Sequence, residues 1–215
     1  MSTKNTTILT TILIVLAALA GLLLWNRLPD PMASHWDIND QVNGTMGKLA
    51  GVFLLPLMTA GLFALFMLIP LIDPLKANIA KFRGVFNIFT VLMTAFMVYV
   101  HALSLAWNLG YTFRMGSALL PALGLLFIFM GFLIEKTKRN FFIGIRTPWT
   151  LSSDTVWDET HRIGGLLFKV SGLLALVGLF FPDYTIWFIL VPAIGSALFT
   201  VVYSYVLFAR EEKAA

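Results

Sequence analysis

The chain has 215 residues, of which 59% are hydrophobic and only 12% are charged, whereas soluble domains carry about 25% charged residues. This composition excludes a water-soluble globular domain, because such a domain must cover itself with polar side chains. The absence of cysteine excludes disulfide scaffolds, thiolate zinc sites and iron–sulfur clusters. The net charge is +4, and the basic residues are confined to particular loops. This distribution indicates orientation by a membrane rather than direct nucleic-acid binding.

Six apolar runs are long enough to cross a hydrocarbon layer of about 30 Å, which takes roughly 20 helical residues. We therefore predict an all-α fold, a polytopic transmembrane helical bundle of about six spans in the plasma membrane. The predicted spans are Ile8–Trp25, Leu49–Ile72, Val85–Trp107, Ser117–Ile134, Ile163–Phe181 and Thr185–Phe208.

Basic residues predict the orientation of these spans, because Lys and Arg near span ends are retained on the cytoplasmic side. Twelve of the 15 Lys and Arg fall on alternate segments, which include both ends of the chain. The remaining segments hold only Arg27, Lys48 and Arg114. This alternation predicts that the N-terminus and the C-terminus are both cytoplasmic.

The first span also has features of a cleavable signal peptide, since Lys4 precedes an apolar run that contains Ala18-Leu19-Ala20. The apolar region of a signal peptide is usually about 7–15 residues long, whereas this run continues to Trp25. We therefore favour a retained first helix, with cleavage as the alternative.

The outer loop, residues 26–48, is too rich in Trp, His, Asp and Gly to be a simple connector. Prolines end the preceding helix and an Asn-Gly pair marks a turn, so the residues between them can form a short extended piece. We interpret the segment as a recognition loop, with His35 and Trp36 as contact residues and Asp37 or Asp40 as acceptors. The alternative is a loop packed on the bundle, with Trp36 at the lipid headgroups.

The inner segment, residues 135–162, begins with basic residues and continues into a helix. Ser152 or Ser153 can cap this helix by accepting a hydrogen bond from an amide of its first turn. Trp157 and His161 are four positions apart, so they share one face of the helix and meet the same neighbour.

The two segments carry patterns that resemble known families. The inner pattern, Gly144-Ile145-Arg146-Thr147-Pro148-Trp149-Thr150-Leu151, then Val156-Trp157 and Thr160-His161-Arg162, resembles the SdpI family of membrane immunity proteins. The outer pattern, Leu28-Pro29, Ser34-His35-Trp36, Gly44 and Gly47-Lys48, resembles a membrane domain of unknown function that often accompanies it. We accordingly predict two regions: residues 1–134, with four spans and the outer loop, and residues 135–215, with the cytoplasmic motif 144–162 and two spans.

The resemblance implies protection of a cell against a secreted peptide toxin and, in the family, signalling through a cytoplasmic transcriptional repressor. The partners are then the lipid bilayer, a hydrophobic or cationic peptide at the outer loop, and a repressor at an inner segment that changes its exposure. We expect no cofactor and no enzymatic activity. The predicted partner contacts are His35, Trp36 and Asp37 outside, and Arg146, Thr147, Pro148, Trp149, Trp157, Thr160, His161 and Arg162 inside.

A metal site is a further hypothesis for the outer side. His101 lies in the outer half of the third span. It could therefore approach His35 and Asp37 of the outer loop from the membrane side and complete a polar cluster. We favour the plainer interpretation that His101 hydrogen-bonds within the bundle.

Two alternative functions remain. A transporter is the runner-up, although the middle of most spans is almost wholly apolar and lacks a polar path. An intramembrane hydrolase is less favoured, because the spacing of Glu159 and His161 matches neither an HExxH zinc motif nor a nucleophile elbow. The acidic residues Asp154, Asp158 and Glu159 are better interpreted as ion-pair partners of Arg146, Arg162 and Lys169.

Overall fold

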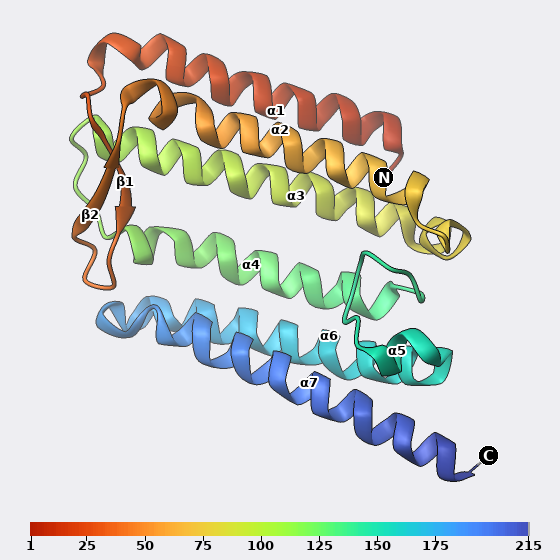
Figure 1. The fold of residues 1–215 in the computed structure, drawn as a ribbon. Coiled ribbons are helices and arrows are strands. Elements are labelled where there is room, and N and C mark those ends of the chain that lie inside the picture. The colour runs from red at the N-terminus through yellow and green to blue at the C-terminus, as the bar shows by residue number, and fades with distance from the viewer. Residues whose placement is uncertain (215) are drawn as a thin grey trace.

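The computed structural model describes residues 1–214, which form seven α-helices and one two-stranded hairpin (Figure 1). Six of the helices are long and apolar enough to cross a membrane, which confirms the predicted multi-pass helical bundle. The elements are α1 (Thr3–Leu24), η1 (Trp25–Arg27), β1 (Met32–Trp36), β2 (Val42–Met46), α2 (Lys48–Ile72), α3 (Lys76–Asn108), α4 (Met115–Lys136), α5 (Pro148–Ser152), α6 (Asp154–Val177), η2 (Gly178–Phe180), η3 (Pro182–Tyr184) and α7 (Trp187–Ala214).

The bundle has two unlike ends (Figure 1). We call the end that carries β1 and β2 the hairpin end, and the end that carries α5 the motif end. Because α1 begins and α7 ends at the motif end, the described chain starts and finishes on the same side of the bundle. An even number of spans requires this, whereas the assignment of that side to the cytoplasm stays a prediction from the charges.

Most helices extend beyond the predicted spans at the motif end, where α1 begins at Thr3 rather than Ile8. α3 begins at Lys76 rather than Val85, with a kink at the buried Phe82, and α6 begins at Asp154 rather than Ile163. α7 continues to Ala214. The apolar runs mark only the membrane-spanning length, whereas backbone hydrogen bonds continue each helix into its polar flanks.

The helices group into two halves, α1–α3 and α4 with α6 and α7, which are joined chiefly where α3 packs on α4. The packing of α4 against α6 is the most extensive, because two glycines meet there. A Cβ on Gly124 would lie 2.9 Å from the carbonyl oxygen of Gly172, so small residues permit this approach. α4, which we predicted as the last span of residues 1–134, therefore lies with the C-terminal helices, and the sequence division stays a prediction.

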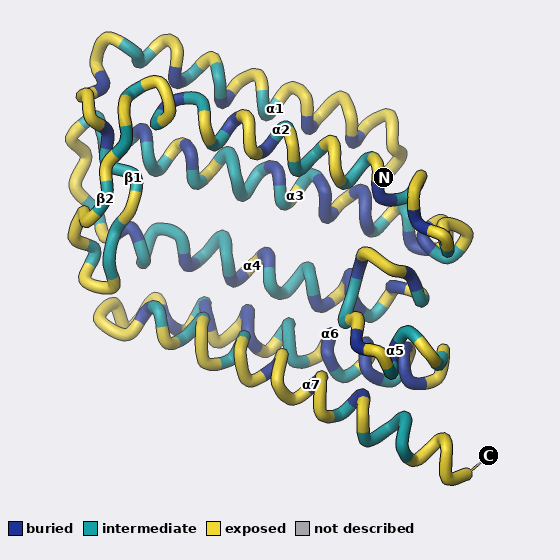
Figure 2. The backbone as a smooth tube through the Cα atoms, viewed as in Figure 1, coloured by how far each residue is buried: buried dark blue, intermediate teal, exposed yellow. Residues whose placement is uncertain are grey.

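The outward faces of the bundle are exposed and apolar (Figure 2). Leu23 on α1 is 82% exposed and Leu198 on α7 is 64% exposed. Soluble monomers rarely expose large contiguous apolar patches, whereas a lipid-facing surface must be apolar. The surface thus agrees with a membrane location.

The hairpin is anchored to the helices by one buried side chain and one amide. Met32 is fully buried against Val52 and Leu105. The side chain of Asn108 accepts a hydrogen bond from the Ala33 amide at 2.8 Å and donates one to the Ala33 carbonyl at 3.0 Å. The Asn108 side chain bonds both backbone groups of Ala33, as the backbone of a neighbouring strand would, and so fixes β1 across the end of α3.

Candidate functional site

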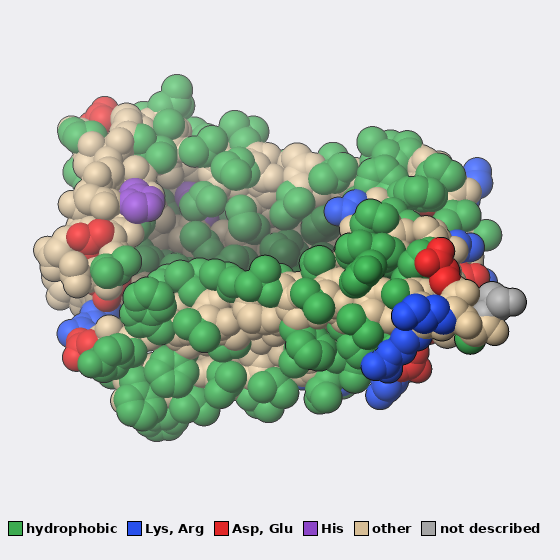
Figure 3. Space-filling view, turned by 60° about the horizontal axis from the view of Figure 1, so that its bottom comes forward, with side chains coloured by type: hydrophobic (Ala, Val, Ile, Leu, Met, Phe, Trp, Pro, Cys, Tyr) green, Lys and Arg blue, Asp and Glu red, His purple; other side chains and the backbone are tan. Residues whose placement is uncertain are grey.

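A cavity of about 450 Å³ lies beneath the hairpin, between the two halves of the bundle. Figure 3 shows a hollow with hydrophobic walls and a histidine at its rim, while most Lys and Arg side chains gather toward the other end. Ligand sites in proteins typically enclose 300–1,000 Å³. The apolar walls of the cavity include Leu54, Leu55, Val100, Leu119, Leu123 and Ile189.

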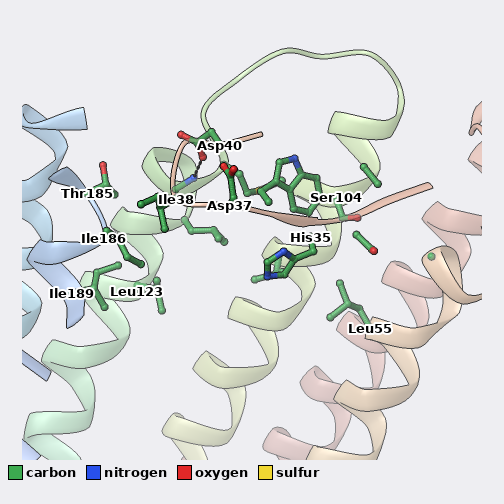
Figure 4. Close-up of a pocket in the computed structure, with 18 of the residues that line it drawn as sticks. His35, Asp37, Ile38, Asp40, Leu55, Ser104, Leu123, Thr185, Ile186 and Ile189 are labelled. Carbon is green, nitrogen blue, oxygen red and sulfur yellow. Dashed lines mark hydrogen bonds between the residues drawn. The ribbon is translucent and has the colours of Figure 1, made fainter. Parts of the chain in front are cut away.

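Three predicted outer residues, His35, Trp36 and Asp37, all line this cavity (Figure 4). Figure 4 shows the His35 ring between the helices that carry Leu55 and Leu123. His35 is exposed, and its Nδ1 forms a hydrogen bond with the side-chain oxygen of Asn43. The extended piece predicted around these residues is confirmed for His35 and Trp36, which belong to β1.

Trp36 is half-buried and packs edge-on against Trp107, with ring centroids 5.7 Å apart. Its indole Nε1 is buried and has no hydrogen-bond partner among residues 1–214. Edge-to-face packing of this kind stabilises aromatic pairs, while the indole nitrogen usually finds an acceptor when it is buried. Trp36 is therefore held by its ring and not by its polar atom.

Acidic side chains dominate the polar part of the cavity. Asp37, Asp40 and Asp183 line it, whereas no Lys or Arg of the described chain does so. The Oδ1 atom of Asp40 accepts a hydrogen bond from the Gly116 amide at 2.8 Å, which joins the hairpin to α4 (Figure 4). Asp183 forms an ion pair with Arg114 at 2.8 Å.

The Asp37 carboxylate organises the turn between the two strands. Its Oδ1 atom accepts hydrogen bonds from the amides of Asn39 and Gln41, at 2.8 and 2.9 Å. In this turn Asp40 has a positive φ of 60°, a left-handed conformation that Asp and Asn tolerate better than most residues. The hairpin thus presents two carboxylates to the cavity from one short turn.

His101 does not join His35 and Asp37. It is buried on α3 facing α1, where a Cβ on Gly21 would lie 3.6 Å from its Nε2 atom. Among residues 1–214, no three His, Asp or Glu side chains form a group that could hold a metal ion. The hypothesis of an outer cluster fails because the His101 side chain points into the α1–α3 interface and away from the cavity.

At the motif end, Trp157 and His161 share a face of α6 as predicted, and both are fully buried. Their rings stack with centroids 4.0 Å apart. His161 Nδ1 donates to the Trp157 carbonyl at 2.7 Å, and its Nε2 accepts from the Ile145 amide at 2.9 Å. These two bonds define a neutral imidazole that locks residues 144–145 onto α6.

A glycine makes this contact possible. Gly144 has a φ of +119°, a backbone conformation that residues other than glycine rarely adopt. A Cβ at this position would collide with Nε2 of His161. Gly144 is therefore required twice, for the turn and for the close approach of the imidazole.

Pro148–Ser152 form a short helix, α5, that we did not predict from the sequence. Thr147 and Thr150 make a reciprocal capping box at its start, with Pro148 in the first turn. We predicted only the next helix, whose N-cap is confirmed as Ser153, since its hydroxyl accepts from the Val156 amide at 3.2 Å. The capping box was readable in principle, although its second member is Thr rather than the usual Glu or Gln.

The predicted inner contacts fall into two groups. Thr147, Trp157, Thr160 and His161 are buried and therefore contact the protein itself in this conformation. Arg146, Pro148 and Arg162 are exposed, and Trp149 is half-buried against Tyr205. Only the second group offers a surface to a partner.

The ion pairs at this end differ in part from those we expected. Arg162 does pair with Glu159 at 2.8 Å, but Asp154 pairs with Arg139 and Asp158 with Lys138. Lys169 lies beside Glu135 of α4 at 2.6 Å. The difference arises because the close packing of α4 on α6 places the end of α4 beside these residues. Arg146 instead donates to the Phe141 carbonyl.

Two polar residues that sequence reasoning missed brace the motif end. Asp73, which is 2% exposed, accepts hydrogen bonds from the amides of Leu75 and Phe141, and so joins the α2–α3 connection to the inner segment. Asn140 is fully buried and bonds the backbone of its own loop. An isolated Asp beside a proline signals only a turn, so its partner could not be read from the sequence.

The chain is similar to two protein-family models and to a named relative. Residues 136–204 match the model of the SdpI/YfhL protein family, and residues 12–60 match a domain of unknown function, DUF1648. The chain is 24% identical over 200 residues to the immunity protein SdpI of Bacillus subtilis (strain 168), covering 92% of this chain and 93% of that protein. The predicted resemblance to the SdpI family is confirmed for residues 136–204. No solved structure matches the chain significantly.

The two matched regions contribute differently to the molecule. The SdpI region contains the inner segment, α5, α6 and most of α7, while the DUF1648 region contains the hairpin and half of α2. Both regions line the cavity, because Thr185, Ile186 and Ile189 of the SdpI region face it as well as His35 and Leu55 of the DUF1648 region. The cavity is thus a shared feature of the two regions.

Proposed function

We propose that this chain is a membrane immunity protein that protects a cell against a secreted peptide toxin, and that the toxin binds at the hairpin-end cavity. The observation that carries the proposal is the cavity itself, an apolar hollow of about 450 Å³ beneath the hairpin. The similarity to a protein named immunity protein SdpI supplies the biological role.

The predicted orientation supports this assignment. The charge alternation predicts a cytoplasmic motif end, so we expect the hairpin end to face outward, where a secreted peptide arrives. The cavity lies between the two halves of the bundle, so a peptide that has entered the outer leaflet can also reach it from the side.

The motif end is suited to a different partner. Arg146, Arg162 and Pro148 are exposed at this end, and Trp149 is half-buried. Arg and Trp are enriched among the contacts that dominate protein interfaces. We propose that the exposed surface of this end meets a cytoplasmic repressor, while the buried Trp157 and His161 hold its shape.

Expression in a toxin-sensitive bacterium tests the proposal. Cells carrying the chain are challenged with candidate secreted peptides, and survival is measured beside uptake of the same peptides. Survival without peptide flux is the expected result. Flux that depends on the chain would instead favour a transporter, and unchanged killing by every peptide would contradict immunity.

Substitutions at the two proposed surfaces should affect two different readouts in the same cells. His35→Ala is expected to reduce survival while leaving repressor recruitment to the membrane unchanged, whereas Arg146→Gln is expected to reduce recruitment and spare survival. Both residues are exposed, so neither change opens a cavity in the core. Equal loss of both readouts in each variant, at normal membrane levels, would remove the proposed division.

A further inference from the structure

We propose that the hairpin-end cavity recognises the positively charged end of an apolar peptide segment, with Asp37 and Asp40 facing the charge and the helices holding the apolar part. The inference rests on the proposed function, because it takes a peptide as the occupant. It specifies the chemistry that such a peptide must carry.

The walls of the cavity define the apolar half of this specificity. Leu55 of α2 lies across it from Leu123 of α4 and Ile189 of α7 (Figure 4). Leu54 and Leu119 also line it. Burial of apolar surface in such a cavity favours the binding of an apolar segment. The volume suits one end of a segment rather than a whole peptide.

The rim defines the charged half. Asp37 uses Oδ1 to hold the turn and Asp40 uses Oδ1 to bond the Gly116 amide of α4, while no hydrogen bond or ion pair from residues 1–214 reaches either Oδ2 atom. Asp183, the third acidic side chain, is already neutralised by Arg114. Two acidic residues therefore line the cavity without an ion-pair partner from the described chain, and an ammonium or guanidinium group complements their charge.

Amide substitutions isolate the charge from the fold. Asp37→Asn and Asp40→Asn keep the Oδ1 acceptor that bonds Asn39, Gln41 or Gly116, and Asn tolerates the positive φ at residue 40. Asp158→Asn is the matched control, since it removes a carboxylate at the motif end. Thermal unfolding of each purified variant shows whether the fold is retained.

Binding is measured by calorimetry on the full chain in phosphatidylglycerol nanodiscs, with empty nanodiscs as the blank. The probes are a short Leu-Ala peptide ending in an amidated lysine and the same peptide ending in amidated norleucine, each with an acetylated N-terminus. We expect the lysine peptide to bind at least about tenfold more tightly, and Asp37→Asn or Asp40→Asn to reduce this preference about three- to tenfold. Rising salt should weaken only the lysine peptide.

Equal binding of the two peptides, or an unchanged preference in both amide variants, would overturn the inference. Repetition in nanodiscs containing phosphatidylethanolamine identifies the occupant: competition by this lipid would assign the site to a lipid ammonium group and contradict the peptide. If the chain does not protect cells but still prefers the lysine peptide, the proposed immunity function is wrong, whereas recognition of a cationic peptide end by the cavity is retained. If cells are protected equally well by both amide variants, the charge recognition fails alone.

Discussion

Trp157 at the motif end and Trp36 at the hairpin end are the central aromatic residues of two contrasting regions. Trp157 is fully buried, stacks on His161 and donates its Nε1 hydrogen to the Thr137 carbonyl at 3.2 Å. Trp36 is half-buried, lines a cavity and leaves its Nε1 without a partner in the described chain. The same residue type is a packing element in one region and part of a cavity wall in the other.

The polar groups of the two ends differ in the same way. At the motif end, both oxygens of Asp73 and both ring nitrogens of His161 form hydrogen bonds within the protein. At the hairpin end, Asp37 and Asp40 line the cavity, and each uses only one carboxylate oxygen in hydrogen bonds within the described chain. Satisfied polar networks fix a single structure, whereas unsatisfied groups in a cavity remain available to a ligand.

The largest expected effect concerns the motif end. Gly144→Ala should lower the free energy of unfolding by about 3 kcal/mol, because it combines a strained backbone with a collision against His161. Thermal or denaturant unfolding in detergent measures the change. Gly195→Ala on α7 is the control, since a Cβ there meets no atom within 4 Å. Equal stability of the two variants would break the view of the motif end as a rigid element.

The two tryptophans give a matched test of intermediate size. Trp157→Phe should cost about 1–3 kcal/mol, because it leaves the Thr137 carbonyl without its donor in a buried site. Trp36→Phe should cost less than about 1 kcal/mol, since the lost Nε1 has no partner to leave behind. The same unfolding assay compares them. A larger loss for Trp36→Phe would reverse the comparison.

The smallest effect is expected at the rim of the cavity. Arg114→Gln removes an exposed ion pair with Asp183 and should change stability by less than about 1 kcal/mol. It also releases a third carboxylate, so the lysine-ended peptide should bind roughly two- to fivefold more tightly. Calorimetry measures this gain. Weaker binding would show that Asp183 does not face the bound cation.

Much of the fold was predictable from sequence because the cost of burying charge in lipid sets both the length and the apolar character of each span. The extra turns of α3 before Val85 were missed, since Lys81 and Arg83 break the apolar run without breaking the helix. The second strand was missed too, because we predicted a turn at Asn43-Gly44, whereas both residues lie within β2 and Gly44 pairs with His35.

The candidate site was predictable only in part. The composition of the outer loop singled out His35, Trp36 and Asp37, and the structure places all three at one cavity. The opposite wall could not be anticipated, because Gly116 and Ile189 look like ordinary span residues until the helices are packed. Burial of His161 was equally hidden, since an interior histidine and a surface histidine look the same in a helical pattern.

The central claim is that the hairpin-end cavity receives the toxin, and filling it is the most direct test. Ala50 on α2 is exposed and lines the cavity, whereas its neighbour Leu49 is 67% exposed and does not line it. Survival of toxin-challenged cells is measured for Ala50→Trp and Leu49→Trp at matched membrane levels. Loss of protection in Ala50→Trp alone is the predicted result, and full protection by Ala50→Trp would contradict the account.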